Sequence, residues 1–188
     1  MAQSHVQEAP DLPTPNRFIT DHDAKGLSVF NTSIPELLPA NIVGGKSKFH
    51  LGYATDKIPA DFAGQADLAT YSSFLSNPPG IFHPGGTVLR IVDIKPGGDS
   101  LMHRTQSLDY GIVLEGEIEL VLDSGESRSL KKSDVVIQRG TNHQWRNKSE
   151  TEWGRMCFVT FESKPIEVDG KAIANEGHNV EAAVPSGD

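Results

Sequence analysis

The stretch GGDSLMHRTQSLDYGIVLEG, from Gly97 to Gly116, decides the fold. It carries a histidine, His103, and a carboxylate, Asp109, between two glycine turns. Residues i and i+2 of a strand share one face, so Thr105 is predicted to point to the same side as His103. In a small barrel the inward side chains of neighbouring strands converge. This stretch therefore predicts polar side chains gathered inside a β-barrel.

A second stretch, SDVVIQRGTNHQWRN from Ser133 to Asn147, is built in a similar way. It has a glycine turn at Gly140 and a histidine, His143, three residues after it. A side chain that directly follows a turn can be aimed into the mouth of a barrel. We therefore expect His143 to lie near His103.

Around these two stretches, strand-like runs recur at a spacing of 8–12 residues from Thr87 to Phe161, separated by Gly or Ser-Gly turns. Many short strands at this spacing are typical of a β-sandwich or small barrel. A short helix is predicted at Leu68–Leu75. The predicted organisation is a flexible tail over 1–16, an arm with extra strands over 17–86, the barrel over 87–162, and a C-terminal arm or tail over 163–188.

The composition excludes several classes of function. Lys and Arg total 17 and Asp and Glu total 25, so the net charge of −8 disfavours nucleic-acid partners and anionic membranes, which would repel the chain. No apolar run is long enough for a membrane span, and the N-terminus lacks the pattern of a signal peptide. With Cys157 as its one cysteine, the chain cannot form an internal disulfide. We expect a cytoplasmic protein.

The two stretches resemble the two motifs of the cupin superfamily, and the resemblance covers about 87–162. The chain is similar in particular to small single-domain cupins of bacteria and fungi, some of them encoded beside polyketide pathways of secondary metabolism. The resemblance implies an all-β cupin barrel, a double-stranded β-helix of the jelly-roll kind, with N-terminal arm strands and a C-terminal tail. It also implies a homodimer.

The departures from the family pattern concern its metal site. The family uses two His and a Glu from the first motif and one His from the second, whereas this chain has Thr105 and Asp109 at two of these positions. What remains, His103, Asp109 and His143, has the donor types of a facial set for Fe, Zn or Mn. Aspartate is shorter than glutamate by about 1.5 Å of reach. The site is therefore expected either to hold one divalent metal or to work metal-free.

Two kinds of function follow from these residues. The first is a small-molecule enzyme, preferably a lyase (dehydratase or decarboxylase) acting on an aromatic or polyketide-like carbonyl compound, with His103 and His143 transferring protons and Asp109 orienting one of them. A non-haem Fe(II) dioxygenase using His103, Asp109 and His143 is the rival enzyme. The second kind is a non-catalytic binding module that retains a vestigial site.

Several neighbours of the motif residues are candidates for binding the substrate. An arginine aimed into the pocket would hold a carboxylate or phenolate. Aromatic side chains would line an apolar pocket, although ordinary core packing explains them equally well. The predicted substrate-binding residues are Thr105, Tyr110, Gln138, Arg139 and Trp145.

Overall fold

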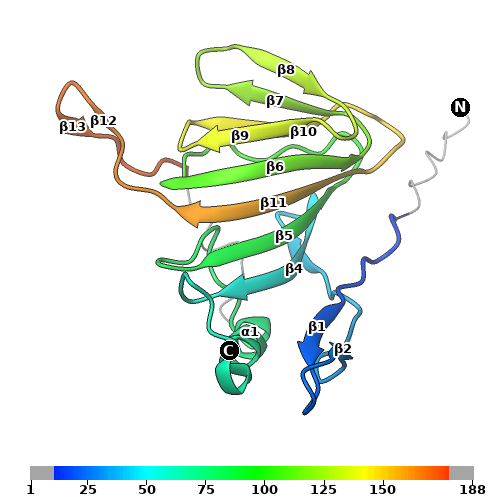
Figure 1. Cartoon of the computed structure of the whole chain (residues 1–188). Helices are drawn as coiled ribbons and strands as arrows, with labels where there is room; N and C mark the ends of the chain where they lie inside the picture. The colour runs from blue at the N-terminus through cyan, green and yellow to red at the C-terminus, as the bar shows by residue number, and fades with distance from the viewer. Residues whose placement is uncertain (1–10, 178–188) are drawn as a thin grey trace, which may run out of the picture.

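The computed structural model describes residues 11–177, and strands dominate it (Figure 1). One sheet has six strands in the order β3-β4-β5-β11-β6-β9, and a second has three in the order β10-β7-β8. All pairings within these sheets are antiparallel. The two sheets enclose an apolar interior, so the predicted β-barrel is confirmed.

The six-stranded sheet consists of β3 (Asn41–Val43), β4 (Ser47–Thr55), β5 (Thr87–Ile94), β11 (Gly154–Glu162), β6 (Ser107–Glu115) and β9 (Val135–Arg139). The three-stranded sheet consists of β10 (His143–Asn147), β7 (Ile118–Leu122) and β8 (Ser127–Leu130). The remaining elements are β1 (Ile19–His22), β2 (Ser28–Asn31), η1 (Ala63–Gln65), α1 (Ala66–Ser76), β12 (Glu167–Val168) and β13 (Lys171–Ala172).

The core of the barrel is built from alternate residues of facing strands. Val92 on β5, Val113 on β6 and Met156 on β11 meet Ile118 and Trp145 from the smaller sheet. Successive strand residues point to opposite faces, so each strand contributes its inward set only. Burying such a side chain stabilises the fold by about 1.5–3 kcal/mol.

The sheet extends beyond the predicted barrel range. β4 pairs with β5 along most of its length, from Ser47 beside Ile94 to Thr55 beside Thr87. The segment 101–105, predicted as a strand, instead makes only isolated bridges at His103 and Arg104. The helix is confirmed, and α1 packs Tyr71 and Leu68 against β4 and β5 in a second apolar cluster. Within residues 11–177, no helix is long and apolar enough to cross a membrane.

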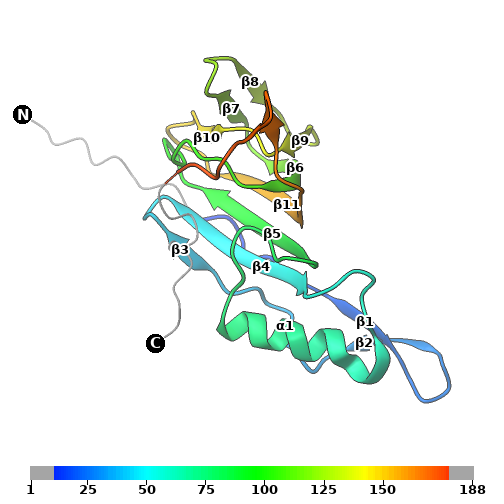
Figure 2. The same cartoon turned by 90° about the vertical axis from the view of Figure 1, so that its left-hand side faces the viewer.

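The N-terminal part of the described chain forms an arm. β1 and β2 pair as a hairpin around a turn in which Gly26 N–H donates to Asp23 O. Figure 2 shows this hairpin projecting past the six-stranded sheet, on the side away from the smaller sheet. The arm is thus positioned outside the barrel, whereas β4 from the same predicted region belongs to it.

A buried ion cluster ties the segment that precedes β3 to the outer side of the sheet. Arg155 on β11 donates to both carboxylate oxygens of Asp93 on β5, at 2.6 and 2.7 Å. His50 on β4 lies with Nε2 3.5 Å from Asp93 and with Nδ1 3.1 Å from the Leu38 carbonyl. Burial alone would raise the pKa of Asp93, but the hydrogen bonds and charge of Arg155 and His50 outweigh it and lower that pKa.

The described C-terminal segment returns across the barrel after the β12–β13 hairpin. Glu176 and Arg104 exchange backbone hydrogen bonds, and Arg104 Nη1 also donates to the Glu176 carboxylate at 3.2 Å. Next to this bridge, a Cβ built on Gly177 would lie 2.7 Å from the Cβ of His103, so only glycine fits there. We call residues 174–177 the strap. Residues 178–188 of the predicted tail lie outside the described residues.

Candidate active site

A cavity of about 480 Å³ lies between the two sheets, and both motif histidines line it. Its apolar wall includes Val92, Trp145 and Phe158, and Asp109 faces it as well. A cavity of this size suits a small organic molecule. The fold therefore brings three of the predicted site residues, His103, Asp109 and His143, to one chamber, with Trp145 in its wall.

The backbone itself holds the two histidines side by side. His103 and His143 form an isolated antiparallel bridge in which each N–H donates to the other's carbonyl at 2.9 Å. Their ring centroids are 4.3 Å apart. His143 is the first residue of β10, directly after the turn at Gly140, which has a φ of +60° that favours glycine.

Each ring is also fixed in one tautomer. Nδ1 of His103 lies 2.9 Å from the Leu101 carbonyl, and Nδ1 of His143 lies 2.9 Å from the Thr141 carbonyl. A carbonyl oxygen can only accept, so each Nδ1 carries the proton of the neutral ring. The Nε2 lone pair of each histidine is consequently left to accept a proton.

Burial keeps these rings neutral. It lowers the pKa of His103, and together with the nearby His103 ring it lowers the pKa of His143 to about 4. A neutral imidazole has a lone pair free to accept a proton, although a lowered pKa makes it a weaker base than an ordinary histidine. The pair can therefore take up a proton from a bound molecule, and one protonated ring would disfavour protonation of the other.

Asp109 has the opposite character. It lies inward on β6, is 6% exposed, and its Oδ1 has no hydrogen-bond partner among the described residues. Burial raises the pKa of Asp109 to about 6. A buried carboxyl with such a pKa can hold a proton in mildly acidic conditions and donate it.

The three residues do not make a closed metal site in this arrangement. Among residues 11–177, no group of three or more His, Cys, Asp and Glu side chains is close enough to hold a metal ion. The donor set thus consists of a histidine pair and a separate carboxylate, and Thr105 supplies no third imidazole. The three side chains are thus arranged as acid–base groups and do not fit the ligand set of a divalent metal.

Four of the predicted substrate-binding residues lie away from this cavity. Thr105 lines a different cleft, because 101–105 does not form the strand on which its shared face with His103 was predicted. Tyr110 is on the outer face of the sheet, edge-on to Phe161. Arg139 is exposed on β9. Gln138 is buried but donates to Thr141, so it holds the turn that precedes His143.

One cavity residue, Arg90, was not among the predicted site residues. It lies inward on β5, between Val88 and Val92, and is 5% exposed. The sequence does carry a signal for it. In Val88, Arg90, Val92 and Ile94 the alternate positions of one strand face are apolar except for a single charge. A charge at an inward position is a candidate functional residue.

The strap contacts the residues that are adjacent in sequence to the two histidines. Glu176 is bonded to Arg104, which follows His103, and accepts from Asn142, which precedes His143, at 3.0 Å. One carboxylate thus joins the two segments that carry the histidines. Asn147, at the end of the second motif, is fully buried and donates to the carbonyls of Ile94, Lys95 and Glu152.

Known proteins resemble this chain in sequence or in structure. A family model described as "Cupin domain" matches residues 90–159. Over the whole length of both chains, the sequence is 65% identical to phomopsin biosynthesis cluster protein D of Diaporthe leptostromiformis. It is 39% identical to a protein of Neurospora crassa named cupin-domain-containing oxidoreductase, over 88% of this chain and 82% of that one. A polyketide cyclase from Streptomyces resistomycificus is similar in structure, with a TM-score of 0.45 and 19% identity over 65% of this chain and 72% of that chain.

Proposed function

The chain belongs to the cupin superfamily, and on that premise we propose that it is a small-molecule enzyme of fungal-type secondary metabolism that transfers protons on a carbonyl compound bound in the cavity. The observation that carries the proposal is the histidine pair, with two Nε2 lone pairs beside an apolar chamber. The name of the phomopsin-cluster relative supports the metabolic setting.

The chemistry best suited to this site is elimination. A neutral histidine takes a proton from the carbon next to the substrate carbonyl, and the electron pair moves to that carbonyl oxygen. As the carbonyl re-forms, a hydroxyl on the neighbouring carbon is expelled, and protonated Asp109 is the group with the pKa to donate the proton with which it leaves as water. In a decarboxylase no proton is removed first: the bond between a substrate carboxylate and the carbon next to the carbonyl breaks, its electron pair moves to the carbonyl oxygen, carbon dioxide leaves, and the same acid protonates the carbon. The proposed activity is that of a lyase, either a dehydratase or a decarboxylase.

The apolar wall contributes by excluding water. Trp145 is 6% exposed and contacts both His143 and Phe158 edge-on, with ring centroids 5.5 and 5.4 Å apart. These rings provide a flat, apolar surface for an aromatic or polyketide-like substrate. Low polarity around the histidines also strengthens charge interactions with an oxyanion as it develops.

The second candidate function is oxidation, which the name of the Neurospora crassa relative favours. In that case the chain would act on the same molecule in the same cavity, with oxygen or another oxidant as co-substrate. A third outcome, binding without turnover, corresponds to the module with a vestigial site.

The test is a comparison of metabolites. The gene for the chain is deleted in the producing strain, and the compound that accumulates is incubated with purified protein and followed by mass spectrometry and an oxygen electrode. Loss of water or carbon dioxide without oxygen uptake supports the lyase. Oxygen uptake in step with product supports the oxidoreductase, and tight binding with an unchanged compound supports the binding module.

A further inference from the structure

The cavity contains a buried cation that has no counter-ion. Arg90 is 5% exposed, and its guanidinium lies over the ring of Phe49 with 5.7 Å between its central carbon and the ring centroid. Both of its hydrogen bonds come from Nη2, which donates to the Pro79 and Gly80 carbonyls at 3.1 Å. Within the described residues, Nε and Nη1 have no protein acceptor and no carboxylate lies within ion-pair distance.

Two partly buried arginines, Arg155 and Arg104, have carboxylate partners. Arg155 is paired with Asp93 in a bidentate ion pair, and Arg104 is paired with Glu176 and Asp123. Of the two acidic residues at the cavity, Asp99 is bound to Lys46 at 2.5 Å, and Asp109 forms no ion pair with Arg90. Arg90 is therefore the buried guanidinium whose charge the described part of the protein leaves unbalanced.

Burying an unpaired charge destabilises the folded protein, because the charge loses its interactions with water. Burial lowers the pKa of Arg90 to about 10, which still leaves it charged at neutral pH. If Arg90 only held the loop at 79–80, a neutral donor would be sufficient, because both acceptors are neutral carbonyls. The charge and the remaining donors are better explained by an anion that enters the cavity.

We propose that Arg90 is the anion-binding residue of the substrate cavity and that the substrate carries a carboxylate. This inference rests on the proposed function, since it names the class of molecule on which the histidine pair acts. A guanidinium presents two parallel N–H groups that match the two oxygens of a carboxylate. With Nη2 held by the loop, the Nε and Nη1 donors are free for this purpose.

The residues that line the cavity also define the shape that a ligand needs in order to fit. Arg90 is on β5, His143 is on β10, and the rings of Trp145 and Phe158 belong to the wall of the same cavity. A molecule that contacts all of them must have an anionic end and an apolar, flat body. The proposed substrate class is accordingly a small aromatic or polyketide-like carboxylic acid.

The experiment uses a matched pair of ligands, salicylate and salicylamide, which share one ring and differ in charge. Binding to the full chain is measured by isothermal titration calorimetry. We expect salicylate to bind at least about tenfold more tightly than salicylamide, as for a hydrogen bond to a charged group. In Arg90→Met the preference should be lost, while in Arg139→Met, a change at an exposed arginine, it should persist.

Two further variants separate this inference from the proposed function. Arg90→Lys keeps the charge without the bidentate donors and should retain part of the preference. His143→Ala should retain the whole preference even where turnover is abolished. The anion site is refuted if wild-type protein binds both ligands equally, if it binds neither at 10 mM, or if Arg90→Met with an unchanged melting temperature keeps the preference.

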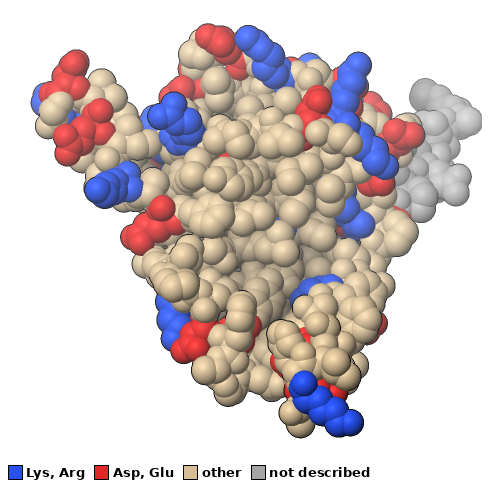
Figure 3. Space-filling view, in the orientation of Figure 1, with Lys and Arg blue, Asp and Glu red and all other residues tan. Residues whose placement is uncertain are grey.

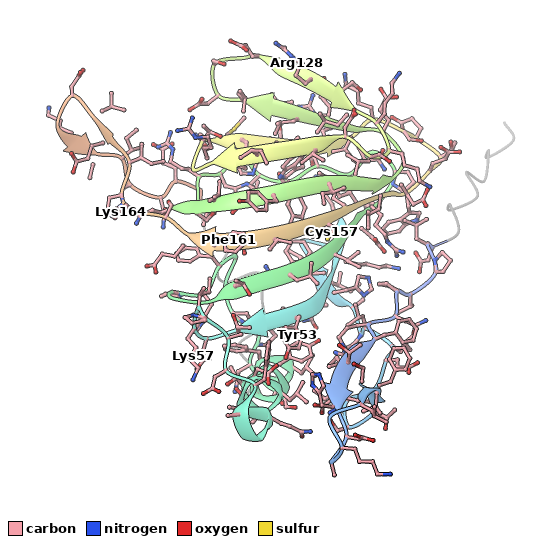
Figure 4. All side chains as sticks on the ribbon, in the orientation of Figure 1. Tyr53, Lys57, Arg128, Cys157, Phe161 and Lys164 are labelled. Atoms are coloured by element: carbon pink, nitrogen blue, oxygen red, sulfur yellow. The ribbon has the colours of Figure 1, made fainter. Side chains whose placement is uncertain are left out.

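The outside of the barrel contrasts with this cavity. The outer face of β5, β11, β6 and β9 is apolar, and its outward residues include Tyr110, Val135 and Ile137, which are 40%, 59% and 53% exposed. Figure 3 shows this face without charges at its centre and with Lys, Arg, Asp and Glu around its margin. Cys157 and Phe161 point out from β11 on the same face (Figure 4). The centre of this face offers no cation to a carboxylate, so a preference for salicylate that depends on Arg90 reports on the cavity.

Discussion

His103 and His143, distant in the sequence, are hydrogen-bonded to each other through their backbones and lie with ring centroids 4.3 Å apart. The bridge fixes the distance between the two main chains, and the contact of each Nδ1 with a main-chain carbonyl orients its ring. Their spacing is set by main-chain geometry, which a side-chain substitution leaves in place. This makes the pair a good subject for substitution.

Replacement of either histidine should abolish proton transfer. We expect His143→Gln and His103→Gln to lower kcat/KM for the accumulated compound by about 10²–10⁴, the usual contribution of a general acid or base. The measurement is product formation followed by mass spectrometry. His22→Gln, at an exposed histidine of the arm, is the control and should keep full activity. Unchanged turnover in both site variants would rule out the histidine mechanism.

The raised pKa of Asp109 predicts a gain in stability when its charge is removed. The folded-state pKa of about 6 lies above the ordinary value of 3.8, so the stability associated with this group is present below about pH 4 and lost as the pH rises through 6. Asp109→Asn should match the wild type near pH 4 and be more stable by up to about 3 kcal/mol at pH 8.

Urea unfolding at these two pH values provides the measurement for Asp109→Asn. The same variant should lose activity if the carboxyl donates a proton, so stability and function are expected to change in opposite directions. An equal effect on stability at both pH values would show that the carboxyl is not held in an unfavourable charged state.

The ion pair between Asp93 and Arg155 should be essential for stability. Arg155→Met leaves the buried carboxylate of Asp93 with His50 Nε2, 3.5 Å away, as its main partner, and the expected loss is about 3–5 kcal/mol. Arg128→Met, at an exposed and weakly paired arginine, is the control and should change stability by less than about 0.5 kcal/mol.

This loss has a defined pH dependence. The pKa of Asp93 is lowered in the folded protein, so its stabilisation is present above the unfolded pKa of about 3.9 and disappears as the pH falls through the folded value. The difference between wild type and Arg155→Met should therefore narrow below about pH 4. A difference that stays constant with pH would mean that packing, and not charge, makes the contribution.

Metal content tests the departure from the family's ligand set. Because the described histidine pair has no third ligand within reach, we expect untagged protein purified without chelator to carry well below one equivalent of Fe, Zn or Mn by elemental analysis. His143→Ala serves as the comparison. Near-stoichiometric metal that disappears in this variant would show that Asp109 closes the site after all, and would favour the oxidoreductase.

The sequence predicts the barrel well because strand alternation and glycine turns are local signals. The placement of His143 after a turn depends only on Gly140 and its neighbours, and the strands β5 to β11 all lie within the predicted barrel range of 87–162. Thr105 shows the limit of such rules. Its predicted direction depended on a regular strand at 101–105, but the chain there makes single bridges to two different partners, β10 and the strap.

Long-range partners explain the remaining differences. Nothing near Asp93 in the sequence indicates that Arg155 will pair with it, and nothing near Arg104 points to Glu176. Arg90 is different, because its position on an apolar strand face is visible in the sequence alone. The lack of a counter-ion, which gives this residue its significance, is a property of the assembled cavity.

The strap determines at which stage of protein synthesis the site can become complete. Protein synthesis proceeds from the N-terminus, and domains fold as their segments emerge. The β-sheets and both histidines precede residue 162, but the carboxylate that joins their two segments belongs to Glu176, near the end of the described chain. A nascent chain can thus form the barrel strands before Glu176 is available to contact the two segments that carry the histidines. Function should accordingly appear only after the segment that contains Glu176 has left the ribosome.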